Sequence, residues 1–169
     1  TDLKRSLDYY SNFKNINILV ADSSDNEFSN LKKYPNIEYF HHPNTTMAEK
    51  IHKTLKKVMT PYVSLSGDDD FILSSALNKC VEFLENNSDY SSAIGKSGFF
   101  YKKQKYDKYT FRLSDDKIPQ ENEKTEERIT SYFCNYETYF YSVIKTKLAK
   151  KIWLKVLENV DELRFNELL

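Results

Sequence analysis

The sequence has few of the residues that break up or cross-link a chain. Among its 169 residues are only three glycines, four prolines and two cysteines. This composition excludes a disordered or repetitive chain, and turns must be made by Asn, Asp and Ser instead. Cys80 and Cys134 are too few for a disulfide scaffold and lack the close spacing of a metal knuckle. We expect both to be small buried side chains in a reducing compartment.

The chain also lacks long apolar runs and an excess of one charge. No stretch approaches the roughly 18 apolar residues of a membrane span, and the N-terminal segment lacks the apolar core of a signal peptide. The 25 basic side chains are balanced by 25 acidic ones. A neutral chain lacks the excess positive charge of proteins that bind nucleic acid or an anionic membrane mainly through charge. We therefore predict a cytoplasmic protein with no transmembrane segment and no nucleic-acid partner.

Aromatic side chains, in contrast, are abundant. The chain has 13 tyrosines and 11 phenylalanines, crowded between Phe99 and Tyr141. Aromatic residues bury large areas, so we interpret them first as packing in the core and on sheet faces. The alternative is a stacking platform for the ring of a ligand.

Strand and helix patterns alternate along the first part of the chain. Short apolar runs predict strands over 16–21, 37–40 and 62–66. Apolar residues at helical spacing predict helices at the start of the chain, around 28–31, over about 46–59, from 74 or 75 to 86, and beyond 148. Thr46 followed by Glu49 matches a capping box at the start of the third of these helices, and Ser74 or Ser75 is predicted to cap the fourth. The fold class is therefore α/β, with a mostly parallel sheet and helices on both faces.

The pattern changes after residue 91. Residues 93–101 and 137–144 look extended, residues 126–134 helical, and residues 102–125 are polar and charged without a strong period. The second extended segment predicts an antiparallel C-terminal addition to the sheet.

Two clusters of acidic residues follow predicted strands. Asp22 and Asp25 come after the first strand, and Asp68, Asp69 and Asp70 come after the third. Carboxyl ends of parallel strands meet at one edge of the sheet, where ligands bind. Three adjacent carboxylates repel one another unless a cation or hydrogen-bond donors compensate. Mg²⁺ or Mn²⁺ would do so and could neutralise a diphosphate, although such acids also serve as the N-terminal cap of a following helix.

Four motifs in this order resemble the nucleotide-binding half of a GT-A glycosyltransferase of the family 2 type. They are Leu3-Lys4-Arg5-Ser6-Leu7 on the first helix, ILVADSSD at 18–25, the helix from Met47, and PYVSLSGDDDFI at 61–72. The resemblance implies a single Rossmann-like, GT-A domain over residues 1–169. Residues 1–101 would form its nucleotide-sugar-binding half and residues 102–169 its acceptor-side half.

The resemblance also implies roles for the acidic residues. Asp22 matches the second acid of the family's Val-Asp-Asp-Gly-Ser loop and would contact the donor base, while Ala21 stands where the first acid would be. Asp68 and Asp70 match the family's Asp-x-Asp motif, which places Asp68 at the donor ribose and Asp70 at the metal that bridges the diphosphate. Asp69 is then a spacer or an auxiliary donor-binding acid.

The chain departs from the family pattern at both ends. No residues before Leu3 match the family's opening strand, which ends in a Pro-x-Tyr-Asn type sequence. We therefore expect a segment of a longer protein, with the strands at 16–21 and 62–66 in one parallel sheet and a vacancy or a foreign strand between them. Glu167 most resembles the family's catalytic base, and Asp161 with Glu162 is the second candidate. For each of these acids, an ordinary solvated helix charge is the alternative.

These observations predict a metal-dependent glycosyltransferase. It would move a sugar from a nucleotide diphosphate donor to a hydroxyl of a glycan or another acceptor, with Mn²⁺ or Mg²⁺ and with inversion at the sugar. Two alternatives stay open: a nucleotidyltransferase, and a non-catalytic module that binds nucleotide sugars or carbohydrate.

Overall fold

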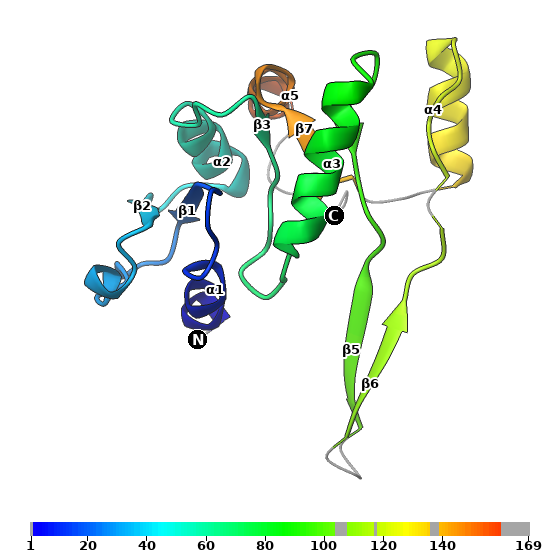
Figure 1. The fold of residues 1–169 in the computed structure, drawn as a ribbon. Helices are drawn as coiled ribbons and strands as arrows, with labels where there is room; N and C mark the ends of the chain where they lie inside the picture. Colours follow the sequence, from blue (N-terminus) through cyan, green and yellow to red (C-terminus); the bar gives the residue numbers. More distant parts are fainter. Residues whose placement is uncertain (1, 104–107, 117, 136–138, 160–169) are drawn as a thin grey trace. The chain divides into compact units, whose positions relative to one another are not determined.

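The computed structural model describes residues 2–103, 108–116, 118–135 and 139–159 (Figure 1). The chain divides into two compact units. The first combines residues 1–93 with residues 140–169, and the second consists of residues 94–139. The boundary at 94 lies close to the position where the sequence pattern changes.

A parallel pair of strands opens the sheet structure of the first unit. After α1 (Asp2–Tyr10), strand β1 (Ile18–Asp22) pairs with β2 (Ile37–His41), in a register that runs from Ile18 opposite Ile37 to Asp22 opposite His41. Between them is η1 (Leu31–Lys33), a 3₁₀ turn in place of the predicted helix. Pro35 limits the turn at its end, because Tyr34, the residue before this proline, disfavours helical geometry.

A second sheet in this unit is antiparallel. Strands β3 (Tyr62–Val63) and β4 (Ser92–Ala93) both pair with β7 (Val143–Lys145), which lies between them. β3 and β4 therefore run in the same direction, and α3 (Ser74–Asn86) connects them. Among the described strands, the parallel part is thus limited to β1 and β2, so the prediction of a mostly parallel sheet is not met. Local periodicity predicts the crossover from β3 to β4 but not that a later strand enters between them.

Strands β1 and β3 are not bonded to each other. Each has a different partner in a different sheet. This separation is what a strand position between them would produce, and their membership in one larger sheet stays a prediction. β3 is also shorter than expected, because the described segment from Ser64 to Ser66 pairs with no strand.

One apolar core joins both sheets of the first unit. Its buried centre comes from α2 (Met47–Leu55), the turn after it, and α5 (Thr146–Asn159). The members of this centre are Ile51, Leu55, Val58 and Ala149. Leu19 of β1, Val63 of β3 and Ile144 of β7 pack against it. Burial of these side chains from three strands fixes both sheets to the same pair of helices.

The ends of the helices follow from their capping residues. The capping box at Thr46 is confirmed: its hydroxyl accepts the Glu49 amide at 3.2 Å, and the Glu49 carboxylate accepts the Thr46 amide at 2.8 Å. α2 ends at Leu55, earlier than predicted, and the chain continues through Lys56 and Lys57 as a turn. α3 begins at Ser74 behind Leu73, which makes no side-chain cap, so the predicted serine cap is wrong.

The second unit contains a hairpin and a helix. β5 (Gly98–Lys103) and β6 (Lys108–Leu113) pair antiparallel, and α4 (Thr125–Cys134) confirms the helix predicted at 126–134. β6 was not predicted, because charged neighbours obscured the alternation of Tyr109, Phe111 and Leu113. Cys134 at the end of α4 is exposed and Cys80 is half-buried, so the expectation that both are buried is wrong.

None of the described helices is long and apolar enough to cross a membrane.

The capping box of α2 gives a first test of this fold. Replacing Thr46 with alanine should lower the free energy of unfolding by about 1 kcal/mol, because the Glu49 amide loses its acceptor at the start of the helix that carries the core. Thr46→Ser keeps an acceptor oxygen and should lose much less. Urea denaturation followed by circular dichroism measures both, and equal losses in the two variants would contradict a capping role.

Candidate functional site

The three adjacent aspartates lie in an acid loop, residues 67–72, whose backbone is held by hydroxyl groups of α1. The Ser6 hydroxyl donates to the Asp68 carbonyl, and the Tyr9 hydroxyl donates to the Ile72 carbonyl at 3.2 Å. The Tyr10 hydroxyl donates to the Asp70 carbonyl at 3.2 Å and accepts the Ile72 amide at 3.0 Å. These bonds orient the loop and leave the three carboxylates exposed to solvent.

Tyr141, which is distant from the acid loop in sequence, contacts one of these carboxylates. The Tyr141 hydroxyl donates to Asp70 Oδ2 at 2.6 Å, and the Tyr141 carbonyl accepts the Ser64 hydroxyl at 3.1 Å. Burial raises the pKa of Tyr141, and the adjacent Asp70 carboxylate adds to the shift. The phenol therefore stays protonated and acts as a donor that orients Asp70. Sequence reasoning missed Tyr141, because no local pattern links it to a loop 71 residues away.

A glycine makes room for two of the carboxylates. A Cβ atom at Gly67 would be 2.9 Å from Asp69 Oδ1 and 3.2 Å from Asp70 Oδ2. The two oxygens therefore converge on the space that this glycine leaves empty. Two converging carboxylates fit a hard cation such as Mg²⁺, which takes one or two of them and completes its shell with water and phosphate oxygens. In the described part of the chain, no group of three or more His, Cys, Asp and Glu side chains is arranged to hold a metal.

Asp22 organises the loop that follows β1. Its Oδ1 accepts both the amide and the hydroxyl of Ser24, at 2.9 and 2.7 Å, and its Oδ2 accepts the Tyr39 hydroxyl at 2.5 Å. His41 bonds through Nε2 to the Ser24 carbonyl at 2.7 Å. This is the geometry of an Asx turn fixed from the neighbouring strand.

The same contacts set the protonation of the pair. Burial opposes the charge on Asp22, but the hydrogen bonds from Tyr39 and Ser24 outweigh it and lower the pKa of the carboxyl. Burial and the Asp22 carboxylate together raise the pKa of Tyr39 to about 12. Asp22 is therefore an ionised acceptor. Donors from the described residues fill three of its roughly four acceptor positions, and none of them occupies the second position on Oδ2.

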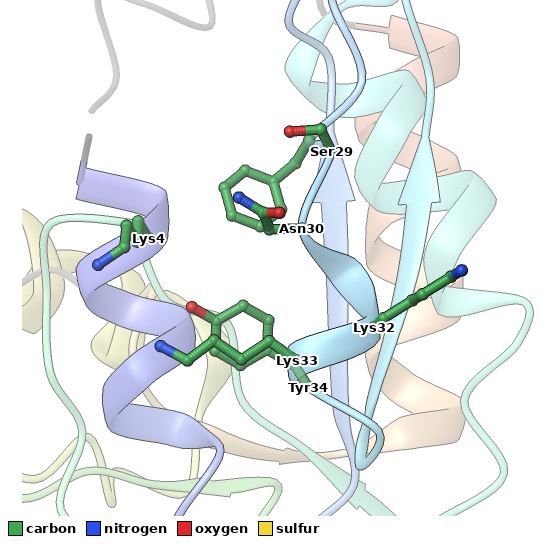
Figure 2. Close-up of a pocket in the computed structure, with 7 residues that line it drawn as sticks. Lys4, Ser29, Asn30, Lys32, Lys33 and Tyr34 are labelled. Atoms are coloured by element: carbon green, nitrogen blue, oxygen red, sulfur yellow. The ribbon is translucent and has the colours of Figure 1, made fainter.

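A cavity of about 400 Å³ lies between α1 and the segment 28–34 (Figure 2). It is lined by Lys4, Phe28, Ser29, Asn30, Lys32, Lys33 and Tyr34. Lys33 and Lys4 both pair with Asp8, at 2.5 and 3.2 Å, and the Tyr34 hydroxyl also donates to that carboxylate at 2.8 Å. These bonds hold the pKa of Asp8 well below its usual range. The cavity contains none of the predicted site residues, and its lysine charges are partly balanced by Asp8.

The structure brings three of the predicted site residues together in one loop. Asp68, Asp69 and Asp70 share the acid loop, and Asp22 ends β1 in the same unit. Glu167, the predicted catalytic base, and the alternatives Asp161 and Glu162 lie outside the described residues. The role of each residue toward a ligand stays a prediction.

Comparison with known families assigns the chain to a class of enzyme. A family model described as glycosyl transferase family 2 matches residues 3–153. The chain therefore belongs to glycosyl transferase family 2. This membership confirms the predicted family, supports an α/β fold and a glycosyltransferase-type function, and implies binding of a nucleotide-sugar donor and an acceptor. No curated protein and no solved structure matches the chain.

The turn at Asp22 generates a second test. Asp22→Ala removes the acceptor of three hydrogen bonds and should lower the free energy of unfolding by about 1–3 kcal/mol. Asp22→Asn keeps an acceptor for Ser24 and should lose less. Because folding lowers the pKa of Asp22, its contribution is present above the unfolded value of about 3.9 and is lost as the pH falls through the folded value. Urea denaturation of Asp22→Asn and the unsubstituted chain should therefore differ at pH 7 and converge in acid.

Proposed function

We propose that this chain transfers a sugar from a nucleotide diphosphate donor to an acceptor hydroxyl, assisted by Mn²⁺ or Mg²⁺. The acid loop carries the proposal. In a member of this family, three exposed carboxylates are held on a backbone that α1 bonds at several points, and two of them converge over Gly67. Fixed carboxylates with open acceptor positions suit a ligand that brings cationic charge and hydroxyl donors.

On the donor side, each acidic residue has a distinct role in this proposal. Asp68 accepts a hydroxyl of the ribose, and Asp69 assists as an auxiliary acid of the same loop. The second position on Asp22 Oδ2 accepts an N–H of the base. Tyr141 and Tyr10 are positioning residues, because they bond to the carboxylate and to the carbonyl of Asp70.

Asp70, with Asp69 beside it, would hold the divalent cation. When bound, such a cation offsets the negative charge that grows on the leaving diphosphate. On the acceptor side, Glu167 takes the proton of the attacking hydroxyl as a general base, with Asp161 or Glu162 as the alternative. Attack opposite the leaving group gives inversion at the sugar.

Release of labelled sugar tests the proposed activity directly. The chain is incubated with common nucleotide diphosphate sugars such as UDP-glucose and GDP-mannose, with a glycan acceptor or water, and with or without Mn²⁺. We expect Mn²⁺-dependent release from at least one donor and a loss of about 100-fold or more in Asp70→Asn, comparable with removal of one group that stabilises the leaving charge. Asp89→Asn, a change of another exposed acid in the same unit, is the matched control.

The outcomes of this experiment distinguish sugar transfer from binding alone and test the metal site separately. Donor binding without sugar release would support the non-catalytic module and overturn transfer. Release that is unchanged by removal of Mn²⁺ and by Asp70→Asn would overturn the metal site but keep the transferase.

Ligand-induced stabilisation tests whether the Asp69 and Asp70 carboxylates that converge over Gly67 bind the cation. Mn²⁺ with a nucleoside diphosphate should stabilise the chain by about 2.7 kcal/mol at 100 times the dissociation constant. A Cβ at this position would displace the Asp69 and Asp70 carboxylates, so Gly67→Ala should lose most of this gain. Gly95→Ala is the control, because its Cβ would meet nothing within 4 Å. Thermal denaturation with and without ligand measures the gain, and equal gains in the two variants would contradict this cation site.

A further inference from the structure

The hairpin of the second unit has no sheet neighbour in the described part of the chain. β5 and β6 form a sheet of two strands, with six register pairs from Gly98 opposite Leu113 to Lys103 opposite Lys108. Its base is closed by an ion pair between Lys96 and Asp116 at 2.6 Å. The strands then extend away from α4 (Figure 1). A two-stranded hairpin by itself is only marginally stable in water, so we expect a partner to cover its surface.

This aromatic hairpin, formed by β5 and β6, exposes large apolar side chains on both strands. Six of them have exposed fractions between 48% and 72%. They are Phe99, Phe100, Tyr101, Tyr109, Phe111 and Leu113. Single exposed apolar residues are ordinary, but a contiguous group of this kind marks an interaction surface.

Apolar side chains occupy both faces of the hairpin. Phe100 lies opposite Phe111 with ring centroids 4.9 Å apart, and the Phe111 ring covers Gly98, where a Cβ would come within 2.5 Å of it. Residues next to each other on a strand point to opposite faces, so Phe99 and Tyr101 belong to the other face. A partner with a flat binding surface would cover only one of these faces. A partner that encloses the hairpin would cover both.

The same segment carries positive charge in a chain that is neutral overall. Residues 98–113 contain four lysines and one arginine but only one acidic residue, Asp107. Three of the lysines, Lys102, Lys103 and Lys108, belong to the strand ends farthest from the base. The surface that fits this hairpin is therefore anionic as well as apolar.

We propose that the aromatic hairpin docks this protein on an anionic lipid surface. Aromatic rings and lysines are enriched together at the boundary between headgroups and acyl chains, where the rings enter the apolar side and the lysines meet lipid phosphates. The unpaired backbone edges of the two strands cannot be satisfied in hydrocarbon, so the hairpin stays at the interface and does not span. This inference is independent of the proposed donor site.

A single-stranded nucleic acid is the competing anionic partner. It would stack bases on exposed rings and pair its phosphates with the lysines. A nucleic acid bound on one face would leave the aromatic residues of the other face in water. The presence of aromatic residues on both faces therefore favours lipid.

Vesicle sedimentation with the full chain tests this proposal. We expect the chain to sediment with vesicles of phosphatidylcholine and phosphatidylserine at a 7:3 ratio, and at least about tenfold more weakly with phosphatidylcholine alone. The combined substitution Phe100→Ser and Phe111→Ser should reduce binding by about tenfold or more, because two rings no longer enter the interface. Met59→Ser, at an apolar residue with 89% exposure in the first unit, is the control and should bind as the unsubstituted chain does.

A charge-reversed pair tests the electrostatic part. Lys102→Glu with Lys103→Glu should abolish the preference for anionic vesicles, whereas Lys56→Glu with Lys57→Glu, an exposed pair at the end of α2, should retain it. A substituted hairpin that misfolds would also lose vesicle binding, so a variant that keeps an aromatic ring is needed. Phe100→Trp should show a blue-shifted fluorescence component on anionic vesicles. The unsubstituted chain, whose only tryptophan is Trp153, should lack this component.

Three results would overturn the proposal. The first is no binding to anionic vesicles together with an unshifted Phe100→Trp spectrum. The second is binding that falls equally in the hairpin variants and their controls. The third is a chain that does not bind vesicles but uses the hairpin to bind another partner. Hairpin-dependent binding of a fluorescent single-stranded oligonucleotide would assign the surface to nucleic acid. Hairpin-dependent dimerisation in analytical ultracentrifugation would assign it to a second copy of the chain.

Discussion

The hydrogen bonds from α1 to the acid loop are the interaction on which the candidate site depends. Neighbouring carboxylates repel one another, which opposes holding three of them in one fixed loop. In this protein the backbone of that loop is bonded to Ser6, Tyr9 and Tyr10, so a helix some sixty residues earlier in the chain holds it in place. All three donors are hydroxyls bound to backbone carbonyls, which leaves most of the carboxylate oxygens available to a ligand.

The two acidic regions differ in how far their charges are already satisfied. Asp22 has three internal donors and a lowered pKa, so most of its acceptor capacity is used in holding the turn after β1. Within the part of the chain that the structure describes, the Asp70 carboxylate accepts one hydrogen bond, from Tyr141. A ligand that brings positive charge therefore gains more at the acid loop, whereas the loop after β1 offers a rigid polar edge.

The shared core explains how these two loops come to be in one unit. β1 and β3 belong to different sheets, yet both pack on the centre formed by α2 and α5. α5 lies more than ninety residues after α2, and the Lys150 ammonium donates to the Val58 carbonyl at 2.9 Å. The C-terminal segment thus completes the unit begun by the first 93 residues, while residues 94–139 form a separate unit with a different surface chemistry.

Local sequence patterns were sufficient for most of the helices, the capping box at Thr46 and the family. These features depend on residues close together in the chain, where spacing, side-chain chemistry and motif order are visible. The patterns did not show that β7 enters between β3 and β4, that β6 forms a hairpin with β5, or that Tyr141 reaches Asp70. Each of these is a pairing between segments far apart or weakly patterned, and its geometry depends on which surfaces bury together. Asp22 shows both levels: the sequence placed it at the carboxyl end of a strand, within one residue of where β1 ends, but only the tertiary structure brought Tyr39 from the neighbouring strand to its carboxylate.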